Sequence, residues 1–197
     1  MKFSINQKDL QQSLSYCQGV IEKRSTLPIL SNVLIDASNS KLKITATDLD
    51  LIFINEIKNV EIAEEGKTTT TSSTIYDIIR KFSPGKKINF ELTNENKIHL
   101  ESEKSMFNLN CLPATEFPLT DENFNGNEFI IKSKKLLKLL NKCKFSVSND
   151  ETRHYLSGIY FHQTNIDDKY FLTAVATDSH RMSISKVLLN EKIQFEP

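Results

Sequence analysis

The sequence predicts an α+β fold in which two short helices per domain pack on one face of mostly antiparallel sheets. Short apolar stretches with strand-like alternation outnumber helical stripes, and they follow the order strand, helix, three strands, helix, three strands. A second, similar series then begins, which indicates repeated domains. Only five glycines and five prolines occur among 197 residues, so an ordered chain with a sizeable core is expected.

Two apolar stripes predict the helices of the first series. Each stripe has the spacing of one buried helix face. They consist of Leu10, Leu14, Cys17 and Ile21, and of Ile75, Ile78, Ile79 and Phe82. Ser72 or Ser73 is expected to cap the second helix, and Pro84-Gly85 to end it.

The strands around these helices are expected to be short. They are predicted at 29–36, 42–46, 51–57, 88–92 and 107–111. The first two flank the turn Asn39-Ser40, and residues 112–118 form an extended segment that leads into a linker near 121–128.

The chain repeats itself over about 50 residues. Residues 3–10 align with 129–136 at an offset of 126, whereas Ala46-Thr47-Asp48 matches Ala176-Thr177-Asp178 at an offset of 130. We expect the four extra residues in the loop at 164–169. The repeat predicts a complete domain at 1–122 and the first half of a second at 128–197. Chance similarity between two amphipathic segments is the alternative.

The helix that opens the second copy is expected to have one apolar and one basic face. The apolar face contains Leu136, Leu139, Leu140 and Cys143, and the basic face contains Lys134, Lys135, Lys138 and Lys142. A solvated surface explains such lysines, and so does a calmodulin-binding or membrane-surface helix. The apolar face, however, corresponds to the core stripe of the first copy.

Charge is balanced overall but segregated along the chain. Lys and Arg number 25, as do Asp and Glu, which excludes a histone-like polycation. The segment 131–145 carries a net charge of +6, and 88–130 carries −6. No apolar run reaches the length of a membrane span, and no secretion signal opens the chain, so a cytoplasmic protein is expected. The three cysteines form no CxxC pair, which argues against a disulfide framework or a zinc site.

Enzyme motifs are absent from the sequence. There is no GxGxxG, Walker, HExxH or GxSxG pattern, and the four histidines lack metal-ligand spacing. The cluster Asp178-Ser179-His180-Arg181 is the one candidate for catalysis. Because neighbouring residues of a strand face opposite ways, we expect instead that Asp178 caps a turn, as Asp48 does in the first copy. His180 and Arg181 would then be surface or pocket residues at the start of a strand.

Several blocks resemble the bacterial DNA polymerase III beta subunit family, the sliding clamps. The resemblance covers the whole chain, in order. Its blocks are Arg24-Ser25-Thr26-Leu27-Pro28-Ile29-Leu30-Ser31-Asn32, Thr47-Asp48-Leu49-Asp50, Leu112-Pro113-Ala114 to Phe117-Pro118, Arg153-His154-Tyr155-Leu156-Ser157-Gly158 and Ala176-Thr177-Asp178-Ser179-His180-Arg181-Met182.

The resemblance implies the DNA-clamp fold and a processivity factor without catalytic residues, metal or cofactor. Clamps have three similar domains per chain and close as head-to-tail dimers around duplex DNA, with helices lining the hole. This sequence would hold the first domain and about half of the second, without the third. The implied partners are duplex DNA, the polymerase III alpha subunit, the clamp loader, and other polymerases and repair proteins that carry a short Leu/Phe-rich motif. No membrane partner is implied.

The resemblance also implies three sets of site residues. The DNA-facing set is Arg24, Lys134, Lys135, Lys138, Lys142 and Asn149. The pocket for partner peptides is Leu156, Thr177, Ser179, His180, Arg181 and Met182, with Arg153, His154 and Tyr155 near it. The dimer interface is Phe107, Leu109, Lys97 and Lys104. Ser179 replaces the glycine expected there.

Two other functions remain open on the residues alone. One is an unrelated α+β enzyme that uses Asp178, His180 and Arg181 as acid/base or anion-binding groups. The other is a generic binding module with a basic helix. Only a clamp requires duplicated domains.

Overall fold

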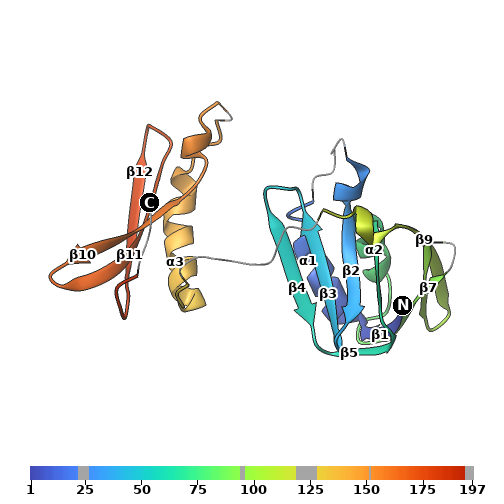
Figure 1. Cartoon of the computed structure of the whole chain (residues 1–197). Coiled ribbons are helices and arrows are strands. Elements are labelled where there is room, and N and C mark those ends of the chain that lie inside the picture. The colour runs from blue at the N-terminus through green and yellow to red at the C-terminus, as the bar shows by residue number, and fades with distance from the viewer. Residues whose placement is uncertain (22–26, 94–95, 119–127, 151, 194–197) are drawn as a thin grey trace. The chain divides into compact units, whose positions relative to one another are not determined.

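The computed structural model of the chain describes residues 1–21, 27–93, 96–118, 128–150 and 152–193 (Figure 1). The chain divides into two compact units, Met1–Thr120 and Asp121–Pro197, here called unit 1 and unit 2. Each unit has its own hydrophobic core.

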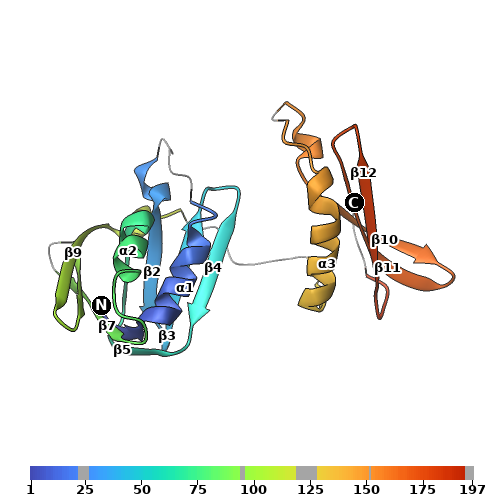
Figure 2. The ribbon, with the colours of Figure 1, turned by 180° about the vertical axis from the view of Figure 1, so that it is seen from behind.

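The described residues of unit 1 form two α-helices and nine strands. In chain order these are β1 (Lys2–Asn6), α1 (Gln7–Cys17), β2 (Asn32–Ser38), β3 (Lys41–Thr47), β4 (Ile52–Ile57), β5 (Val60–Glu64), β6 (Gly66–Thr71), α2 (Ser72–Ile79), β7 (Lys87–Thr93), β8 (Lys97–Ser102) and β9 (Ser105–Leu112). The strands are ordered β4-β3-β2-β6-β9-β8-β7-β1-β5 and pair antiparallel. Figure 2 shows α1 and α2 side by side on one face of the sheet, which confirms the predicted α+β class.

The helices of unit 1 form where the apolar spacing predicts them. Leu10, Leu14 and Cys17 of α1 are buried, as are Ile75 and Ile79 of α2. Both helices are shorter than predicted, because the chain turns after Cys17 and α2 ends at Ile79, before Phe82 and Pro84-Gly85. The expected cap of α2 was also wrong: its N-cap residue is Thr71, and Ser72 is the first helical residue.

Two predictions about strand positions were wrong. The strand expected from Ile29 begins at Asn32, since Pro28 starts a 3-10 turn over Pro28–Ser31. The strands β5 and β6 were missed, and no position was predicted for β8. β6 has the sequence Gly-Lys-Thr-Thr-Thr-Thr, whose strand preference comes from β-branching rather than from apolar alternation.

Threonines form the centre of β6. Thr68, Thr69 and Thr70 are buried, and the hydroxyls of the last two donate to the carbonyls of Leu112 and Asn110, both at 3.0 Å. Without these hydrogen bonds, the two buried hydroxyl groups would have no partner, which would cost free energy.

Unit 1 contains two interlocked halves, each of the form strand, helix, three strands. The first half is β1-α1-β2-β3-β4 and the second is β6-α2-β7-β8-β9. Each half gives its first strand to the sheet of the other, because β1 pairs with β7 and β6 pairs with β2. The halves therefore complete each other's sheets.

The described residues of unit 2 contain the helix and the three strands of one such half, without its first strand. These elements are α3 (Ser133–Cys143) and a three-stranded antiparallel sheet of β10 (Tyr160–Ile166), β11 (Lys169–Thr177) and β12 (Met182–Leu188). Short 3-10 turns occupy Lys144–Ser146 and His154–Leu156. The core of unit 2 is small and centres on Leu139, Cys143, Leu172, Ala174, Ala176 and Val187.

The helices α1 and α3 differ in which of their apolar side chains are buried. In α3 only Leu139 and Cys143 are fully buried, while Leu136 is 36% exposed. The expectation that Leu136 belongs to the buried face was therefore wrong for the structure described here.

The position predicted for the four extra residues of the second copy was also wrong. Both copies have a two-residue hairpin turn with positive φ, at Asn39 and Ser40 (51° and 57°) and at Asp167 and Asp168 (49° and 58°). The extra residues therefore lengthen the hairpin and not its loop. Accordingly, β11 has nine residues where β3 has seven.

Candidate functional site

A hydrogen-bonded turn before β12 carries several of the predicted site residues. The hydroxyl of Thr177 donates to the carbonyl of Arg181 at 2.8 Å. Asp178 Oδ1 accepts the backbone N–H groups of His180 and Arg181, at 3.0 and 2.9 Å. The central residue, Ser179, has a φ of 76°, so the backbone reverses there. The prediction that Asp178 caps a turn is confirmed.

The first copy builds the same turn before β4. Thr47 Oγ1 donates to the carbonyl of Leu51 at 2.8 Å, and Asp48 Oδ1 accepts the N–H groups of Asp50 and Leu51. Leu49 takes the position of Ser179, with a φ of 83°. The Thr-Asp pair is thus a structural device that both copies use to end one strand and start the next.

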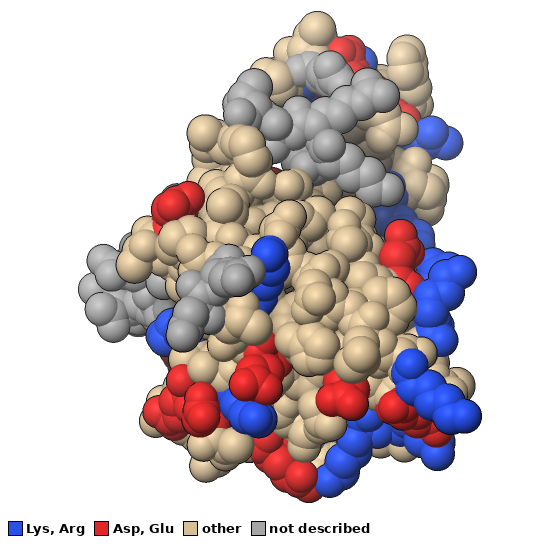
Figure 3. All heavy atoms as spheres, turned by 90° about the vertical axis from the view of Figure 1, so that its right-hand side faces the viewer, with Lys and Arg blue, Asp and Glu red and all other residues tan. Residues whose placement is uncertain are grey.

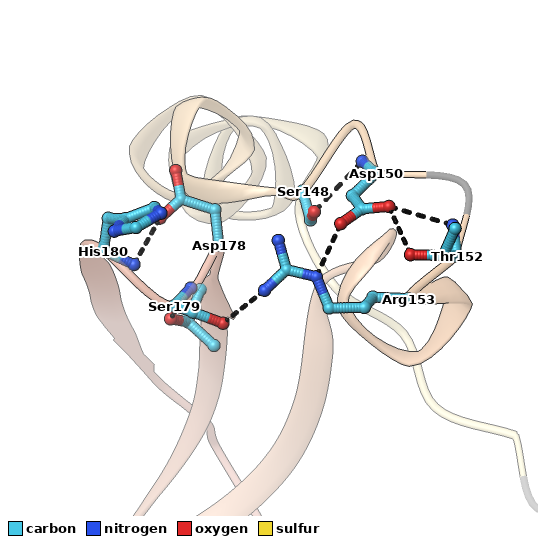
Figure 4. Close-up of polar contacts among 8 residues, drawn as sticks. Ser148, Asp150, Thr152, Arg153, Asp178, Ser179 and His180 are labelled. Atoms are coloured by element: carbon cyan, nitrogen blue, oxygen red, sulfur yellow. Dashed lines mark hydrogen bonds and ion pairs between the residues drawn. The ribbon is translucent and has the colours of Figure 1, made fainter.

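The geometry of Asp178 does not suit acid/base catalysis. Its second oxygen accepts from Arg181 Nε at 2.8 Å, and its bond to His180 is to the backbone N–H and not to the imidazole (Figure 4). The backbone N–H groups, foremost that of Arg181, together with the guanidinium lower the pKa of Asp178 to about 2. The carboxylate of Asp178 therefore stays ionised, and both of its oxygens already accept hydrogen bonds.

A second polar cluster lies in the loop between α3 and β10. Asp150 Oδ1 accepts from the hydroxyl and the backbone N–H of Thr152, at 2.6 and 3.0 Å, and Oδ2 accepts from Arg153 Nε at 2.7 Å. These bonds, that of the Thr152 hydroxyl first, lower the pKa of Asp150 to about 2.

Arg153 joins this loop to the turn before β12. Its terminal Nη1 donates to the hydroxyl of Ser179 at 2.9 Å, so the guanidinium spans from Asp150 to Ser179 (Figure 4). The sequence predicted neither link. The three-residue spacing of Asp150 and Arg153 was the available signal for the first, whereas the second needs the tertiary fold.

The predicted pocket residues are grouped around this bridge. Thr177 and Met182 are directly paired across β11 and β12. Met182 is 63% exposed, so it is not a core residue. Leu156 is half-buried, and His180 and Arg181 are exposed. This end of unit 2 therefore presents an apolar side chain beside cationic and hydroxyl groups.

The predicted DNA-facing residues are placed as follows. Lys134, Lys138 and Lys142 are exposed on α3, whereas Lys135 is half-buried and donates from Nζ to the carbonyl of Leu188 at 2.6 Å. Asn149 is exposed next to Asp150. Arg24 lies outside the described residues.

The predicted interface residues lie on β8, β9 and the turn between them. Phe107 is 37% exposed and packs edge-on against Phe82, with ring centroids 5.6 Å apart. Leu109 is buried in the core of unit 1, Lys97 is half-buried and Lys104 is exposed. Figure 3 views the side of unit 1 where β7 and β9 lie, and shows an uncharged centre with acidic and basic side chains around its lower margin.

The pairings of β9 leave part of one edge open. Among the described residues, Ser105 to Asn110 pair with β8 only, and β6 pairs with Leu112 and Cys111. A strand edge of this kind is available for pairing with another chain.

A metal site and a membrane span find no support in the described part of the chain. No group of three or more His, Cys, Asp or Glu side chains comes together there to hold a metal ion. No helix among those residues is long and apolar enough to cross a membrane.

Two family models match the chain in succession. The model of the DNA polymerase III beta subunit N-terminal domain matches residues 1–121, and the model of its central domain matches residues 130–196.

Curated relatives give the same picture. The chain is 35% identical over 188 residues to the beta sliding clamp of Caulobacter vibrioides, and 31% identical over 193 residues to that of Escherichia coli K12. These alignments cover 95% and 98% of this chain but 50% and 51% of the relatives. The chain thus spans about half the length of the curated relatives it matches.

Solved structures resemble this one closely. The DNA polymerase sliding clamp of Caulobacter crescentus superimposes with a TM-score of 0.88 at 35% identity, covering 96% of this chain and 51% of that one. The sliding clamp of Bartonella birtlesii bound to griselimycin gives 0.89 at 38% identity, covering 95% and 50%.

Proposed function

The chain belongs to the DNA polymerase III beta subunit family, and on that premise we propose that it acts within a sliding clamp, a non-enzymatic processivity factor that encircles duplex DNA. Residues 1–122 would form the first clamp domain, and 128–197 part of the second. The DNA contacts would be directed at phosphates, because a clamp must slide without reading sequence.

The lysine face of α3 is the observation that carries this proposal. Lys134, Lys138 and Lys142 are exposed on one side of the helix, while its other side packs on the sheet. No ion pair of theirs with an acidic side chain is found among the described residues, so their charge is available to phosphate. Exposed lysines also suit sliding, since hydrated phosphate contacts are weak and exchange readily.

We further propose that partner peptides bind at the turn before β12. Met182 and Leu156 would supply the apolar wall, and Thr177, Arg181 and His180 the polar rim. A short Leu/Phe-rich peptide needs such a combination of apolar surface and polar anchors. The partners would be the polymerase III alpha subunit, the clamp loader, and other polymerases and repair proteins with this motif. An exposed methionine suits several partners because its unbranched side chain repacks easily.

The edge of β9 around Phe107 would be the clamp's dimer interface. Its unpaired stretch, Ser105 to Asn110, supports strand pairing with another subunit.

The test of the DNA proposal is a charge reversal with a matched control. The triple variant Lys134→Glu, Lys138→Glu and Lys142→Glu is expected to weaken low-salt binding of duplex DNA by about tenfold or more, because each lost cation removes a phosphate contact. The control replaces three exposed lysines of unit 2 that lie off α3, Lys169, Lys186 and Lys192, by Glu. Fluorescence anisotropy across a salt series measures both.

The net charge of the two variants is identical, so the comparison isolates the helix face. Wild-type affinity is expected to be weak, with a dissociation constant of about 10⁻⁴ M or more at physiological salt, and indifferent to DNA sequence. Equal losses in both variants, or binding insensitive to salt, would contradict a DNA-facing α3.

A further inference from the structure

The two apolar walls of the candidate peptide site belong to different parts of unit 2. Leu156 ends the 3-10 turn of the loop before β10, whereas Met182 begins β12 directly after the turn. Two backbone hydrogen bonds hold Leu156 in its loop. Its N–H donates to the carbonyl of Arg153 at 2.9 Å, and its carbonyl accepts the N–H of Ser148 at 3.0 Å. A contact between Arg153 and the turn therefore influences how the two walls lie relative to each other.

Two side-chain hydrogen bonds connect the segment between α3 and β10 with the region around the start of β12. The hydroxyls of Ser146 and Ser183 share one, at 2.6 Å, and Arg153 Nη1 donates the other to Ser179 Oγ at 2.9 Å. Both Ser146 and Ser183 are buried, so their bond belongs to the interior of unit 2. Ser179 is exposed and Arg153 is half-buried, so the second bond lies at the surface, beside the candidate peptide site (Figure 4).

Unit 1 builds the equivalent turn without such a surface bond. Leu27 and Leu49 take the positions of Arg153 and Ser179 in the first copy, and a leucine side chain neither donates nor accepts a hydrogen bond. The turn before β4 nevertheless has the same Thr and Asp hydrogen bonds, and its central φ of 83° is close to the 76° of Ser179. The Arg153–Ser179 bond is therefore not needed to form the turn.

Ser179 adopts a backbone conformation that is unfavourable for serine. Its φ of 76° lies in the left-handed region, which glycine adopts without strain. A glycine would relieve this strain, but it would have no hydroxyl to accept the N–H of Arg153. What the serine adds at this position is thus the acceptor oxygen.

The guanidinium of Arg153 is held from two sides. Nε donates to Asp150 Oδ2 at 2.7 Å, and Nη1 donates to Ser179 Oγ. A guanidinium has five N–H donors, so three remain for a ligand. The side chain is 33% exposed, which leaves it within reach of a peptide.

We propose that Ser179 is a positioning residue of the candidate peptide site, because its hydroxyl fixes the Arg153 guanidinium between the loop and the turn before a peptide binds. The inference rests on the proposed function. A free arginine side chain has many rotamers, and immobilising it on binding lowers affinity. With Asp150 and Ser179 as partners, Arg153 is already ordered. Its remaining N–H groups would then donate to carbonyl groups of a Leu/Phe-rich peptide.

Two replacements of Ser179 separate the hydroxyl from the backbone strain. Ser179→Gly and Ser179→Ala both remove the acceptor, but only glycine relieves the unfavourable φ. Ser179→Ala should therefore unfold at a lower urea concentration than Ser179→Gly. Both should bind an unlabelled synthetic Leu/Phe-rich peptide about two- to tenfold more weakly than the wild-type chain, because Arg153 must then be ordered on binding. Titration of the ¹⁵N-labelled full chain by NMR measures this affinity, even where it is weak.

The position of the guanidinium can be read without any peptide. Rotation about the Cζ–Nη bonds of Arg153 requires its hydrogen bonds to break, so ¹⁵N NMR should show slow rotation in the wild-type chain and faster rotation in both Ser179 variants. The Arg153 signal is identified by its absence from the spectrum of Arg153→Lys. This measurement tests the contact independently of the proposed function.

The matched control is Leu49→Gly, the same replacement at the equivalent turn of unit 1. It relieves the same kind of backbone strain, but it removes no hydrogen bond to an arginine. We expect it to leave both the peptide affinity and the rotation of the Arg153 guanidinium unchanged.

The possible failures of this inference and of the proposed function differ. Equal peptide affinity in the wild-type chain and Ser179→Gly, or unchanged guanidinium rotation, would overturn the role of Ser179 and leave the peptide site standing. A loss of affinity in Ser179→Ala alone would also overturn it, since affinity would then follow the stability of the turn. A wild-type chain that binds no Leu/Phe-rich peptide would overturn the proposed peptide site and the role of Ser179 with it.

Discussion

Single carboxylates hold the loops of unit 2 in place. Asp178 accepts two backbone N–H groups and a guanidinium N–H, and Asp150 accepts three N–H or O–H groups. Bonds to the charged form lower the pKa of both carboxyls to about 2. Both side chains are half-buried and hydrogen-bonded within their own loops, so their role is to fix loop geometry at the candidate peptide site.

The depressed pKa values predict acid sensitivity. A carboxyl whose pKa is lower in the folded than in the unfolded state stabilises the fold above about pH 4, and this contribution is lost as the pH falls toward about 2. We expect the melting temperature of unit 2 to drop over this window, and to drop less in Asp178→Asn. Thermal unfolding followed by circular dichroism at a series of pH values measures this. The double variant with Asp150→Asn should flatten the profile further, and an unaltered profile would contradict the assignment.

Two apolar residues of unit 2 differ in exposure, and their replacement is therefore expected to change stability by different amounts. Met182 is 63% exposed, so Met182→Ala should change the free energy of unfolding by no more than about 0.5 kcal/mol. Leu172 is 1% exposed, so Leu172→Ala should cost about 2–5 kcal/mol. Urea titration measures both. A large loss of stability in Met182→Ala would place this side chain in the core and remove it from the proposed peptide pocket.

At the scale of elements, some helices and strands are determined by local sequence signals and others by tertiary strand pairing. The helix α1 starts where Asn6 Oδ1 accepts the N–H of Lys8 at 2.9 Å, a local N-cap. The strand β6, in contrast, has no apolar alternation and exists because it lies between β2 and β9.

The N-cap of α1 gives a quantitative prediction. Asn6→Ala should lower the free energy of unfolding of unit 1 by about 1 kcal/mol, because an N-terminal N–H of the helix loses its acceptor. Asn6→Asp keeps the acceptor oxygen and should stay within a few tenths of a kcal/mol of wild type. Chemical denaturation of both variants measures their free energies of unfolding. Equal losses would show that the side chain acts through some contact other than the cap.

For the whole molecule, the main feature is the presence of two separate cores. In unit 1, both helices and the strands of both halves contribute to one core. In the described part of unit 2, the core lies between one helix and a three-stranded sheet. Apolar burial supplies most of the stability of a domain, so the smaller core should be the weaker one.

We therefore expect two unfolding transitions in calorimetry. Leu172→Ala should shift only the lower transition, and Ile44→Ala, at a fully buried position of unit 1, only the upper one. A single transition shifted by both variants would contradict separate cores.

The sequence alone determined the α+β class, both apolar stripes of unit 1, the repeat and the Asp178 turn, because these depend on residue spacing along the chain. Tertiary structure decided the rest. The threonines of β6 became a central strand only between two neighbours, and Arg153 reached Ser179 only because the fold brought a loop and a turn together. Leu136 has the sequence pattern of a core residue, but burial depends on which elements cover it, and spacing does not encode that.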